Sequence, residues 1–559
     1  MRLQIFKHFL WLFIAVSLPD VVSAQDSLMD VLPPDIHPVV ILQGSNYEMG
    51  YQYGVLAGHL VEKRRDKVMA ALVGSTTPKY IEEGVKAIQY YIKQYAPECI
   101  DIIRGMADGA KDAGNDVSYE DVLILNCRLP KMGVADFPNE AKNEVLEKGC
   151  SVCSAWGSAT RDGRLIGMDT HDVGGALYQL MVVAFPEDGN PYMYGSSAGE
   201  LGNHFLMNNK GIFFGNSGGG GSPRNEDFGY GISWSCSLPH IARYANNATE
   251  ARDMIMKMKI NIPENFHFVD TRGNAYVIEK TTAIQAVRKP GDFGERDFLF
   301  STNNVLIDKM KVTKDTDQFT GGHGGYGTIT APPRNQLLWD MLSNYHGHID
   351  VEFIKMILRF PGDGPPYPPK DGWETKILRP SNSRVAVIVP DDSDKGYAYI
   401  CTGSAGKYIP ATTDPRGRYS IDKYINSTKT FYKLTLASEP KMVCKAAMKD
   451  AEVAFNKAHQ SFMKLDYSFQ GYAELKRMYN EANTEFYRGQ SCLNKAILSK
   501  GREAVLLFSK ATTQFTRAQA HAMQIYEAIS PPPTNPQDLG LKPFGGDWGI
   551  WETKFKLTK

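Results

Sequence analysis

The sequence predicts an α+β protein in which helices are layered on antiparallel sheet. Residues 35–135 carry apolar side chains at helical spacing, introduced by one short apolar strand. After Lys148 the pattern changes to short alternating segments separated by turn dipeptides such as Asp162-Gly163. Between Ser438 and Ile529 the helical spacing returns. This succession is typical of an α+β protein or an αββα sandwich, with helical segments before and after it.

Each element is expected from its own pattern. The expected strands are 38–42, 151–160, 164–169, 177–185, 193–197, 204–207, 211–215, 267–270, 275–280, 298–302, 383–389 and 396–402. The expected helices are 47–70, 80–107, 118–125, 247–258, 335–342 and 351–358. Gly50, Gly54 and Gly58 lie one helical turn apart and would let a neighbouring element approach closely. Asp466 to Gly471 breaks the last helical segment into two antiparallel partners.

Length and composition favour a large core with an appendage. A chain of 559 residues exceeds what one hydrophobic core usually holds. Hydrophobic residues make up 43% of it, which is enough for a sizeable core. Lys and Arg number 62, as do Asp and Glu, whereas a nucleic-acid surface requires a basic excess. We therefore expect no nucleic-acid partner.

The first residues have the character of an export signal. Arg2 and Lys7 precede an apolar run over 9–16, and Ala24 ends a small-residue stretch suited to cleavage before Gln25. The run is too short to span a bilayer, so a membrane anchor is the less favoured interpretation. No later segment of the sequence is long and apolar enough to cross a membrane. We expect a secreted or periplasmic protein, or a lysosomal one if the source is eukaryotic.

Candidate chemistry centres on two cysteines where the helical leader meets the first strand of the sheet region. They lie in the run Gly149-Cys150-Ser151-Val152-Cys153. A cysteine at such a junction is well placed to become a new N-terminus. Its own α-amine, with a pKa of about 8, would then accept the thiol proton near neutral pH. Nucleophile and base would reside in one residue, so no separate histidine is needed.

Further motifs follow one another in order along the chain. They are Gly44-Ser-Asn-Tyr-Glu-Met-Gly-Tyr-Gln-Tyr-Gly54, Gly105-Met-Ala-Asp-Gly-Ala110, Leu125-Asn-Cys-Arg128, Gly149-Cys150-Ser151, Asn208-Asn-Lys-Gly211, Asp270-Thr-Arg-Gly273 with Glu279, and Thr302-Asn303-Asn304. Together they resemble the penicillin acyltransferase (acyl-CoA:6-aminopenicillanic acid acyltransferase, peptidase C45) family of N-terminal-nucleophile hydrolases. The resemblance runs from about residue 37 to 405, and each motif alone is weak.

The resemblance implies an αββα N-terminal-nucleophile sandwich that cuts itself before its cysteine. It also implies amide hydrolysis or acyl transfer through a thioester, on a small acyl-amide or acyl-donor substrate, without a cofactor or metal. The segment before the cut would stay associated as a small subunit. The expected division is a signal peptide (1–24), a helical leader (25–149), a catalytic sandwich (150–435), a helical hairpin (436–530) and an extended tail (531–559).

Either cysteine fits part of the pattern. Cys150 follows a glycine, whose missing side chain lets a thiol reach the scissile carbonyl, and it stands thirteen residues before Gly163. Cys153 stands ten residues before Gly163, the spacing of the related bile-salt hydrolases and acid ceramidases. Cys150 is the favoured nucleophile, with Cys153 as the alternative. The alternative is that both cysteines are buried core residues with no chemical role.

The residues around the cysteine depart from the family at one place. The family shows Gly-x-Asn-x-Asp, whereas this chain has Gly167-Met-Asp169-Thr-His171-Asp172. Asp169 or Asp172 would hold the ammonium form of the amine, and His171 would shuttle a proton. A plain polar turn is the alternative. By the family match, Asn303 is the best donor to an oxyanion and Asn208 the second.

Two other functions stay open. One is a lipid amidase or phospholipase B-like hydrolase, and the other is a non-catalytic exported binding protein on the same fold, because fold does not secure function. Cys150 and Cys153 match a C-x-x-C metal motif by letter but lack a second ligand pair nearby.

We predict that the mature protein begins at Gln25, because the charged start, apolar run and small-residue ending together specify removal of the first 24 residues. Edman sequencing of the exported protein measures this directly. Finding Met1 at the mature N-terminus would contradict it.

Overall fold

The computed structural model describes residues 36–127, 149–172, 178–203, 206–219, 227–310, 331–360, 377–378, 382–403, 405, 430–465 and 472–543. The expected signal peptide and the end of the tail lie outside these ranges. Helix and strand content is mixed, as the sequence predicts.

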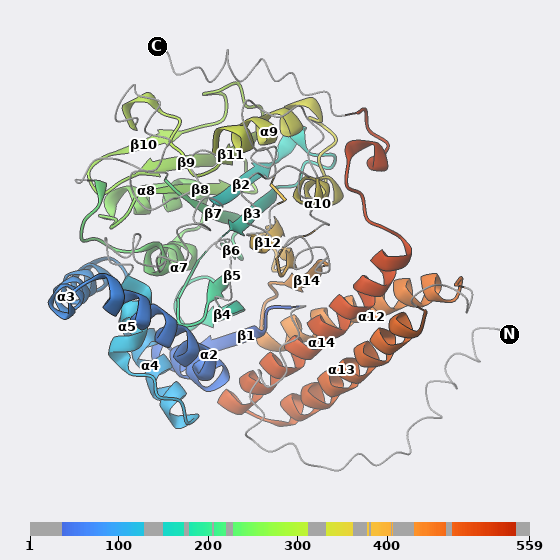
Figure 1. Ribbon diagram of the computed structural model, residues 1–559, viewed down its shortest axis with the longest axis horizontal. Helices are drawn as coiled ribbons and strands as arrows, with labels where there is room; N and C mark the ends of the chain where they lie inside the picture. The colour runs from blue at the N-terminus through green and yellow to red at the C-terminus, as the bar shows by residue number, and fades with distance from the viewer. Residues whose placement is uncertain are drawn as a thin grey trace.

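Two sheets form the centre of the molecule (Figure 1). The first has the order β1 (Val39–Gly44), β4 (Gln179–Pro186), β5 (Tyr192–Ser197), β6 (Leu206–Asn208), β7 (Ile212–Gly218), β8 (Glu264–Asp270), β9 (Ala275–Lys280) and β10 (Gln285–Arg288). The second has the order β11 (Phe298–Ser301), β2 (Gly149–Ala155), β3 (Ile166–Asp172), β12 (Asn382–Val389), β13 (Tyr397–Cys401) and β14 (Tyr432–Thr435). The sequence analysis missed the four-residue strands β10 and β14.

Strand β1 differs from the expectation of an antiparallel sheet. It pairs with β4 in parallel, with Val39 opposite Met181, whereas the other strand pairs are antiparallel. Both faces of β1 are covered: Val40 belongs to one hydrophobic cluster and Ile41 to another. A continuous apolar run is typical of such a doubly buried strand. The N-terminal strand therefore completes a sheet whose other strands lie between residues 179 and 288.

Three hydrophobic clusters separate four layers. The middle cluster lies between the sheets and includes Val152 of β2 and Phe213 of β7. The outer face of the first sheet is covered by α2 (Asn46–Ser75), α3 (Pro78–Tyr95), α4 (Glu98–Asp112), α5 (Tyr119–Cys127), α7 (Trp234–Tyr244) and α8 (Ala248–Lys257). The outer face of the second is covered by α9 (Ala331–Asn344) and α10 (Val351–Arg359). No described helix combines the length and apolar character needed to cross a membrane.

Glycines bring the leader helices into backbone contact. A Cβ atom on Gly50 of α2 would lie 2.0 Å from the carbonyl oxygen of Ile102 in α4, and one on Gly54 would lie 2.1 Å from that of Met106. The close approach predicted from this glycine spacing is confirmed. The expected helix 80–107 is split, because Pro97 separates α3 from α4.

The C-terminal segment contains three helices, so the predicted two-helix hairpin is wrong. They are α12 (Pro440–Phe462), α13 (Tyr472–Leu498) and α14 (Gly501–Ile529), which lie side by side in Figure 1. Gly501, at the start of α14, has φ 55°, a conformation that favours glycine and allows the chain to turn there. Ala447 of α12 and Phe515 of α14 share the middle cluster with Ile41, so these helices pack on β1.

The outer edge of β1 is closed by side chains. Thr513 Oγ1 of α14 accepts the N–H of Val39 at 3.0 Å and donates to its carbonyl at 3.2 Å. Ser509 Oγ does the same for Ile41 at 2.9 and 3.2 Å. The side-chain amide of Gln52 in α2 accepts the N–H of Gln43 and donates to its carbonyl, both at 2.8 Å. Hydroxyls one helical turn apart thus replace a neighbouring strand, which leaves this edge satisfied.

We predict that Ser509→Ala combined with Thr513→Ala destabilises the protein by about 2–6 kcal/mol, because two buried N–H groups on β1 lose their acceptors at about 1–3 kcal/mol each. Urea unfolding gives the change in the free energy of unfolding. Thr516→Ala is the matched control, since that buried hydroxyl donates only to carbonyls of its own helix. Equal effects of the double variant and the control would contradict the edge-closing role.

Candidate functional site

Cys150 and Cys153 lie on opposite faces of β2. Successive side chains of a strand alternate, so Cys150 shares the face of Val152, which packs between the two sheets. Cys153 belongs to the cluster under α9 and α10, where it is fully buried. Burial raises the pKa of the Cys153 thiol, which disfavours the reactive thiolate. The structure therefore favours Cys150 as the candidate nucleophile.

The backbone of Cys150 is held by two buried side chains. Its N–H donates to Asn303 Oδ1 at 2.6 Å, and its carbonyl accepts from Arg334 Nη1 at 2.6 Å. Arg334 Nη2 also donates to Asn303 Oδ1, at 2.9 Å. Asn303 reaches this position because β11 pairs with β2 and the chain continues past Ser301 alongside it. The predicted asparagine and cysteine are thus brought together.

The sequence analysis missed Arg334. This residue lies in the first turn of α9, just before the predicted helix 335–342, and its side chain is completely buried. Besides Cys150 and Asn303, it donates to Ser151 Oγ at 2.8 Å. No local pattern in the sequence marks an arginine as buried, so only the packing of α9 on β2 reveals it.

His171 lies directly opposite Cys150, and Arg384 lies directly opposite His171. The register of β2, β3 and β12 places these three residues in one row. Residues opposite each other in an antiparallel sheet point to the same face, with Cβ atoms about 4.5–5.5 Å apart. Asp169 occupies the next row, opposite Val152, so its side chain also faces the first sheet. A polar row thus enters the space between the sheets.

Arg384 is a fully buried cation in this row. A Cβ atom on Gly195 of β5 would lie 2.5 Å from the guanidinium carbon, so the glycine makes room for it. Burial lowers the pKa of Arg384 to about 10, while the charge of Asp169 opposes that shift. The guanidinium therefore stays protonated at neutral pH. Its Nη1 donates to Gln179 Oε1 at 3.0 Å.

Two predicted site residues are placed elsewhere. Successive side chains of a strand alternate, so Asp172, which follows His171, faces away from the inter-sheet space. On that side Asn382 Nδ2 donates to Asp172 Oδ1 at 2.5 Å. Asn208 donates both amide hydrogens to carbonyls at the C-terminal end of α7, those of Ala242 and of the cap residue Ala245. An asparagine has two such hydrogens, so Asn208 has none for an oxyanion and its predicted role as a donor is wrong.

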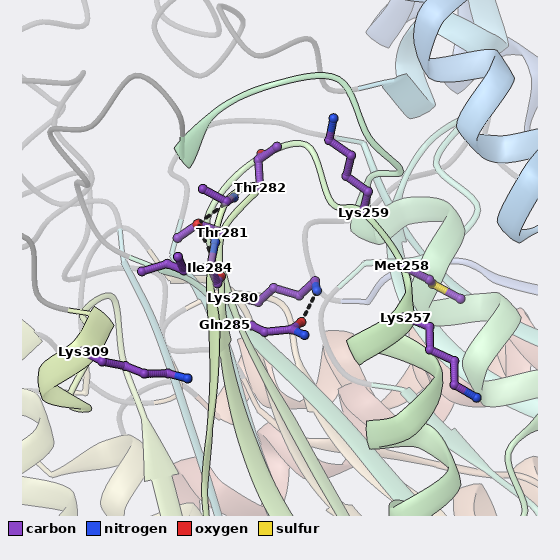
Figure 2. Close-up of a pocket in the computed structure, with 10 residues that line it drawn as sticks. Lys257, Met258, Lys259, Lys280, Thr281, Thr282, Ile284, Gln285 and Lys309 are labelled. Carbon is purple, nitrogen blue, oxygen red and sulfur yellow. Dashed lines mark hydrogen bonds between the residues drawn. The ribbon is translucent and has the colours of Figure 1, made fainter.

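A pocket of about 540 Å³ lies at the far edge of the first sheet (Figure 2). It is lined by Lys257, Met258, Lys259, Lys280, Thr281, Thr282, Ala283, Ile284, Gln285 and Lys309. The amine of Lys280 is directed at Gln285, whereas Lys257 and Lys259 extend away from it in different directions (Figure 2). The lysines do not converge on one point, and none of the candidate catalytic residues lines this pocket.

The described part of the chain contains no cluster of side chains suited to coordinate a metal ion. No group of three or more His, Cys, Asp or Glu side chains there is arranged to hold a metal ion. The residues gathered around Cys150 are instead hydrogen-bond donors and acceptors, together with one thiol. Such a set suits acyl chemistry at sulfur.

Comparison with known proteins gives distant relatives. No family model matches the chain. An uncharacterized protein of Archaeoglobus fulgidus is 26% identical over 345 residues, which is 57% of this chain and 57% of that protein. The chain therefore matches little more than half the length of this relative.

Two solved structures are also similar, at low scores. A conjugated bile acid hydrolase from Clostridium perfringens is 12% identical with a TM-score of 0.30, over 50% of this chain and 98% of that one. A penicillin V acylase from Agrobacterium tumefaciens is 12% identical with a TM-score of 0.27, over 45% of this chain and 83% of that one. TM-scores this low do not establish a shared fold, so the site rests on its own geometry.

We predict that Lys280 titrates near pH 8, because burial lowers the pKa of its amine to about 8 from the usual value of about 10.4. The neutral, reactive amine then predominates above pH 8 rather than above about pH 10. Competitive acetylation followed by peptide mass mapping measures the midpoint, with free N-acetyl-lysine as the reference. A midpoint near 10.4 would show that water or an anion reaches the amine.

Proposed function

We propose that the chain is an exported N-terminal-nucleophile hydrolase of the penicillin acyltransferase kind. It cuts itself before Cys150 and then hydrolyses a linear amide bond, or transfers an acyl group, through a thioester. Support comes from the ordered motifs of the sequence and from two sheets layered between helices. The observation that carries the proposal is the hydrogen bond from the backbone N–H of Cys150 to Asn303 Oδ1 at 2.6 Å.

That nitrogen is the atom which would become the base. In the intact chain it is an amide and cannot accept a proton, but after the cut it is an α-amine with an unperturbed pKa of about 8. The acceptor Asn303 Oδ1 would hold the amine beside its own thiol. Arg334 donates to the same oxygen, and its positive charge disfavours the ammonium form. The amine is thereby favoured as a neutral base at physiological pH.

The cutting step uses only atoms at the junction. The thiol sulfur of Cys150 attacks the carbonyl carbon of Gly149, the C–N bond between the two residues breaks, and the thiol proton ends on the nitrogen. Water then hydrolyses the resulting thioester and leaves a carboxylate on Gly149. Because Gly149 has no side chain, its carbonyl is open to the thiol.

Turnover would repeat the same chemistry on substrate. The thiol proton passes to the α-amine, and the sulfur takes the acyl group while the leaving amine takes the proton. Water or an acceptor amine then resolves the thioester. Asn303 has two amide hydrogens, of which one donates to the carbonyl of Gly218 at 3.3 Å, so the other would face the oxyanion.

The leader would remain bound after the cut. β1 pairs with β4 along six residues and is closed on its outer edge by α14 and α2, so no backbone group of Val39, Ile41 or Gln43 depends on the Gly149–Cys150 bond. The apolar side chains of β1 are buried in both neighbouring clusters. Separation would require denaturation.

We predict that Cys150→Ala gives one uncut, inactive chain, because it removes the sulfur that attacks Gly149. After export, the wild type should instead give pieces 25–149 and 150–559, about 14 and 46 kDa in proportion to the 62.2 kDa of the whole chain. Denaturing gels and intact mass spectrometry measure this. Cys153→Ala is the matched control and should still be cut, because its thiol lies on the opposite face of β2.

Three results would overturn parts of the proposal. An uncut Cys153→Ala chain with wild-type sequence beginning at Cys153 would make that residue the nucleophile. A cut Cys150→Ala chain would show processing by another protease. An intact and fully active wild-type chain would remove the N-terminal-nucleophile mechanism altogether.

A further inference from the structure

Three polar side chains form a relay that ends at His171. Arg384 Nη1 donates to Gln179 Oε1 at 3.0 Å, and Gln179 Nε2 lies 3.2 Å from His171 Nδ1. Arg384 comes from β12, Gln179 from β4 of the other sheet, and His171 from β3. The relay therefore crosses the space between the sheets.

Arg384 determines which way the amide of Gln179 points. A guanidinium can only donate hydrogen bonds, so the atom of Gln179 that faces it must be the oxygen. The –NH2 group then faces His171 and Ser383 Oγ, the latter at 2.9 Å. This removes the usual ambiguity between oxygen and nitrogen in a glutamine side chain.

The amide in turn determines the protonation of His171. An –NH2 group can only donate, so His171 Nδ1 must accept and carries no proton. The other neighbour of Nδ1, Ser383 Oγ, lies 3.5 Å away, which is too long for a good hydrogen bond, and its own hydrogen is donated to the carbonyl of His171 at 2.7 Å. A neutral imidazole whose Nδ1 accepts has its proton on Nε2.

We propose that Arg384 and Gln179 are positioning residues that hold His171 neutral with its proton on Nε2, as a hydrogen-bond donor to the sulfur of Cys150. The proposal deepens the proposed function, on which it rests for the role of the thiol. Cys150 and His171 are directly opposite on one face of the sheet. The Cβ atoms of such a pair are about 4.5–5.5 Å apart, which is within reach of an imidazole ring. A donor at this place stabilises the thiolate, whereas the sequence pattern gives His171 only the role of shuttling a proton.

Other charged and titratable groups lie near this row of residues. In the described residues they are Asp169 on β3, Arg384 on β12, Arg334 on α9, Glu200 after β5, Tyr432 on β14 and His37 before β1. Burial lowers the pKa of His37 to about 3 and raises that of Tyr432. Neither of these two therefore changes charge near neutral pH.

The test replaces the donor in the relay by an acceptor. In Gln179→Glu one carboxylate oxygen still accepts from Arg384, but the other can only accept from Nδ1 and so moves the proton there. Nε2 then has a proton only while the ring is an imidazolium. We expect iodoacetamide to alkylate Cys150 at the wild-type rate at low pH, while the ring of the variant is an imidazolium, and about tenfold more slowly at high pH, once the imidazolium is lost.

Three further variants serve as a control and as a replacement for the test. Ser383→Ala removes the other contact of the Gln179 amide and leaves the relay, so it should keep the wild-type profile. If Gln179→Glu does not fold, His171→Gln and His171→Asn replace it: a glutamine amide reaches the place of Nε2 and should retain most of the thiol reactivity, whereas an asparagine amide reaches only the place of Nδ1 and should lose it. Cys150 is followed by peptide mass mapping.

Failure of the relay and failure of the proposed function are distinguishable. Alkylation needs neither substrate nor the cut, so a wild-type chain that stays whole yet shows the expected shift in Gln179→Glu rejects the function and keeps the relay. A parallel pH profile of Gln179→Glu and wild type, or equal losses in His171→Gln and His171→Asn, rejects the relay. In turnover, the relay predicts a lower kcat for Gln179→Glu with KM unchanged, since the effect is on the thiolate.

Discussion

A shift of β2 by one residue against β3 would turn Cys150 away from His171 and toward α9, because every side chain of a strand changes face when its register moves by one. Contacts between the two sheets prevent this. A Cβ atom on Gly215 of β7 would lie 2.5 Å from Val152, and one on Gly167 of β3 would lie 2.8 Å from Phe213, so each large side chain fills a place left by a glycine on the facing sheet. A one-residue change of register would move these large side chains away from the glycines that make room for them, and a close-packed interior leaves no other space. The identity of the thiol that enters the inter-sheet space thus depends on packing rather than on the cysteines themselves.

The same middle layer connects the two ends of the chain. β1 contributes Ile41 to it, and α14 contributes Phe515. At the surface, Arg502 of α14 forms a paired contact with Glu48 of α2 at 2.7 and 2.8 Å. The C-terminal helices are therefore a wall of the sandwich that covers its leader strand, not an appendage to it. Strand β1 joins the first sheet only when the N-terminal segment, β4 and α14 have met, so this edge of the sheet depends on long-range contacts.

Features that depend on a local sequence pattern could be predicted, whereas features that depend on packing between distant segments could not. Strand positions, the leader helices and the junction at Cys150 are local patterns, and they agree with the structure to within a few residues. The prediction of a helical hairpin failed because the break between α13 and α14 is only Ser499 and Lys500 and lacks proline, so its main turn signal is the single glycine Gly501. Arg334, Gln179 and Arg384 were invisible for a different reason: each lies in an ordinary helix or strand, and only the facing sheet or helix buries it. Asn208 had the right motif but its amide is used to end α7.

The departure from the family pattern at His171 acquires a physical meaning from its neighbours. An aspartate there would place a second negative charge beside Asp169 in a low-dielectric layer, where like charges cannot both stay ionised without cost. A neutral imidazole avoids that cost while still offering one donor to sulfur. It requires a partner that leaves the ring uncharged, and a carboxylate beside Nδ1 would not do so, whereas an amide does. Gln179 meets this requirement only because a cation fixes its orientation, and Arg384, whose pKa burial lowers to about 10 against the opposing charge of Asp169, is that cation. The arginine, glutamine and histidine thus form one unit, in which the charge of Arg384 sets the orientation of the Gln179 amide and the amide sets the proton of His171.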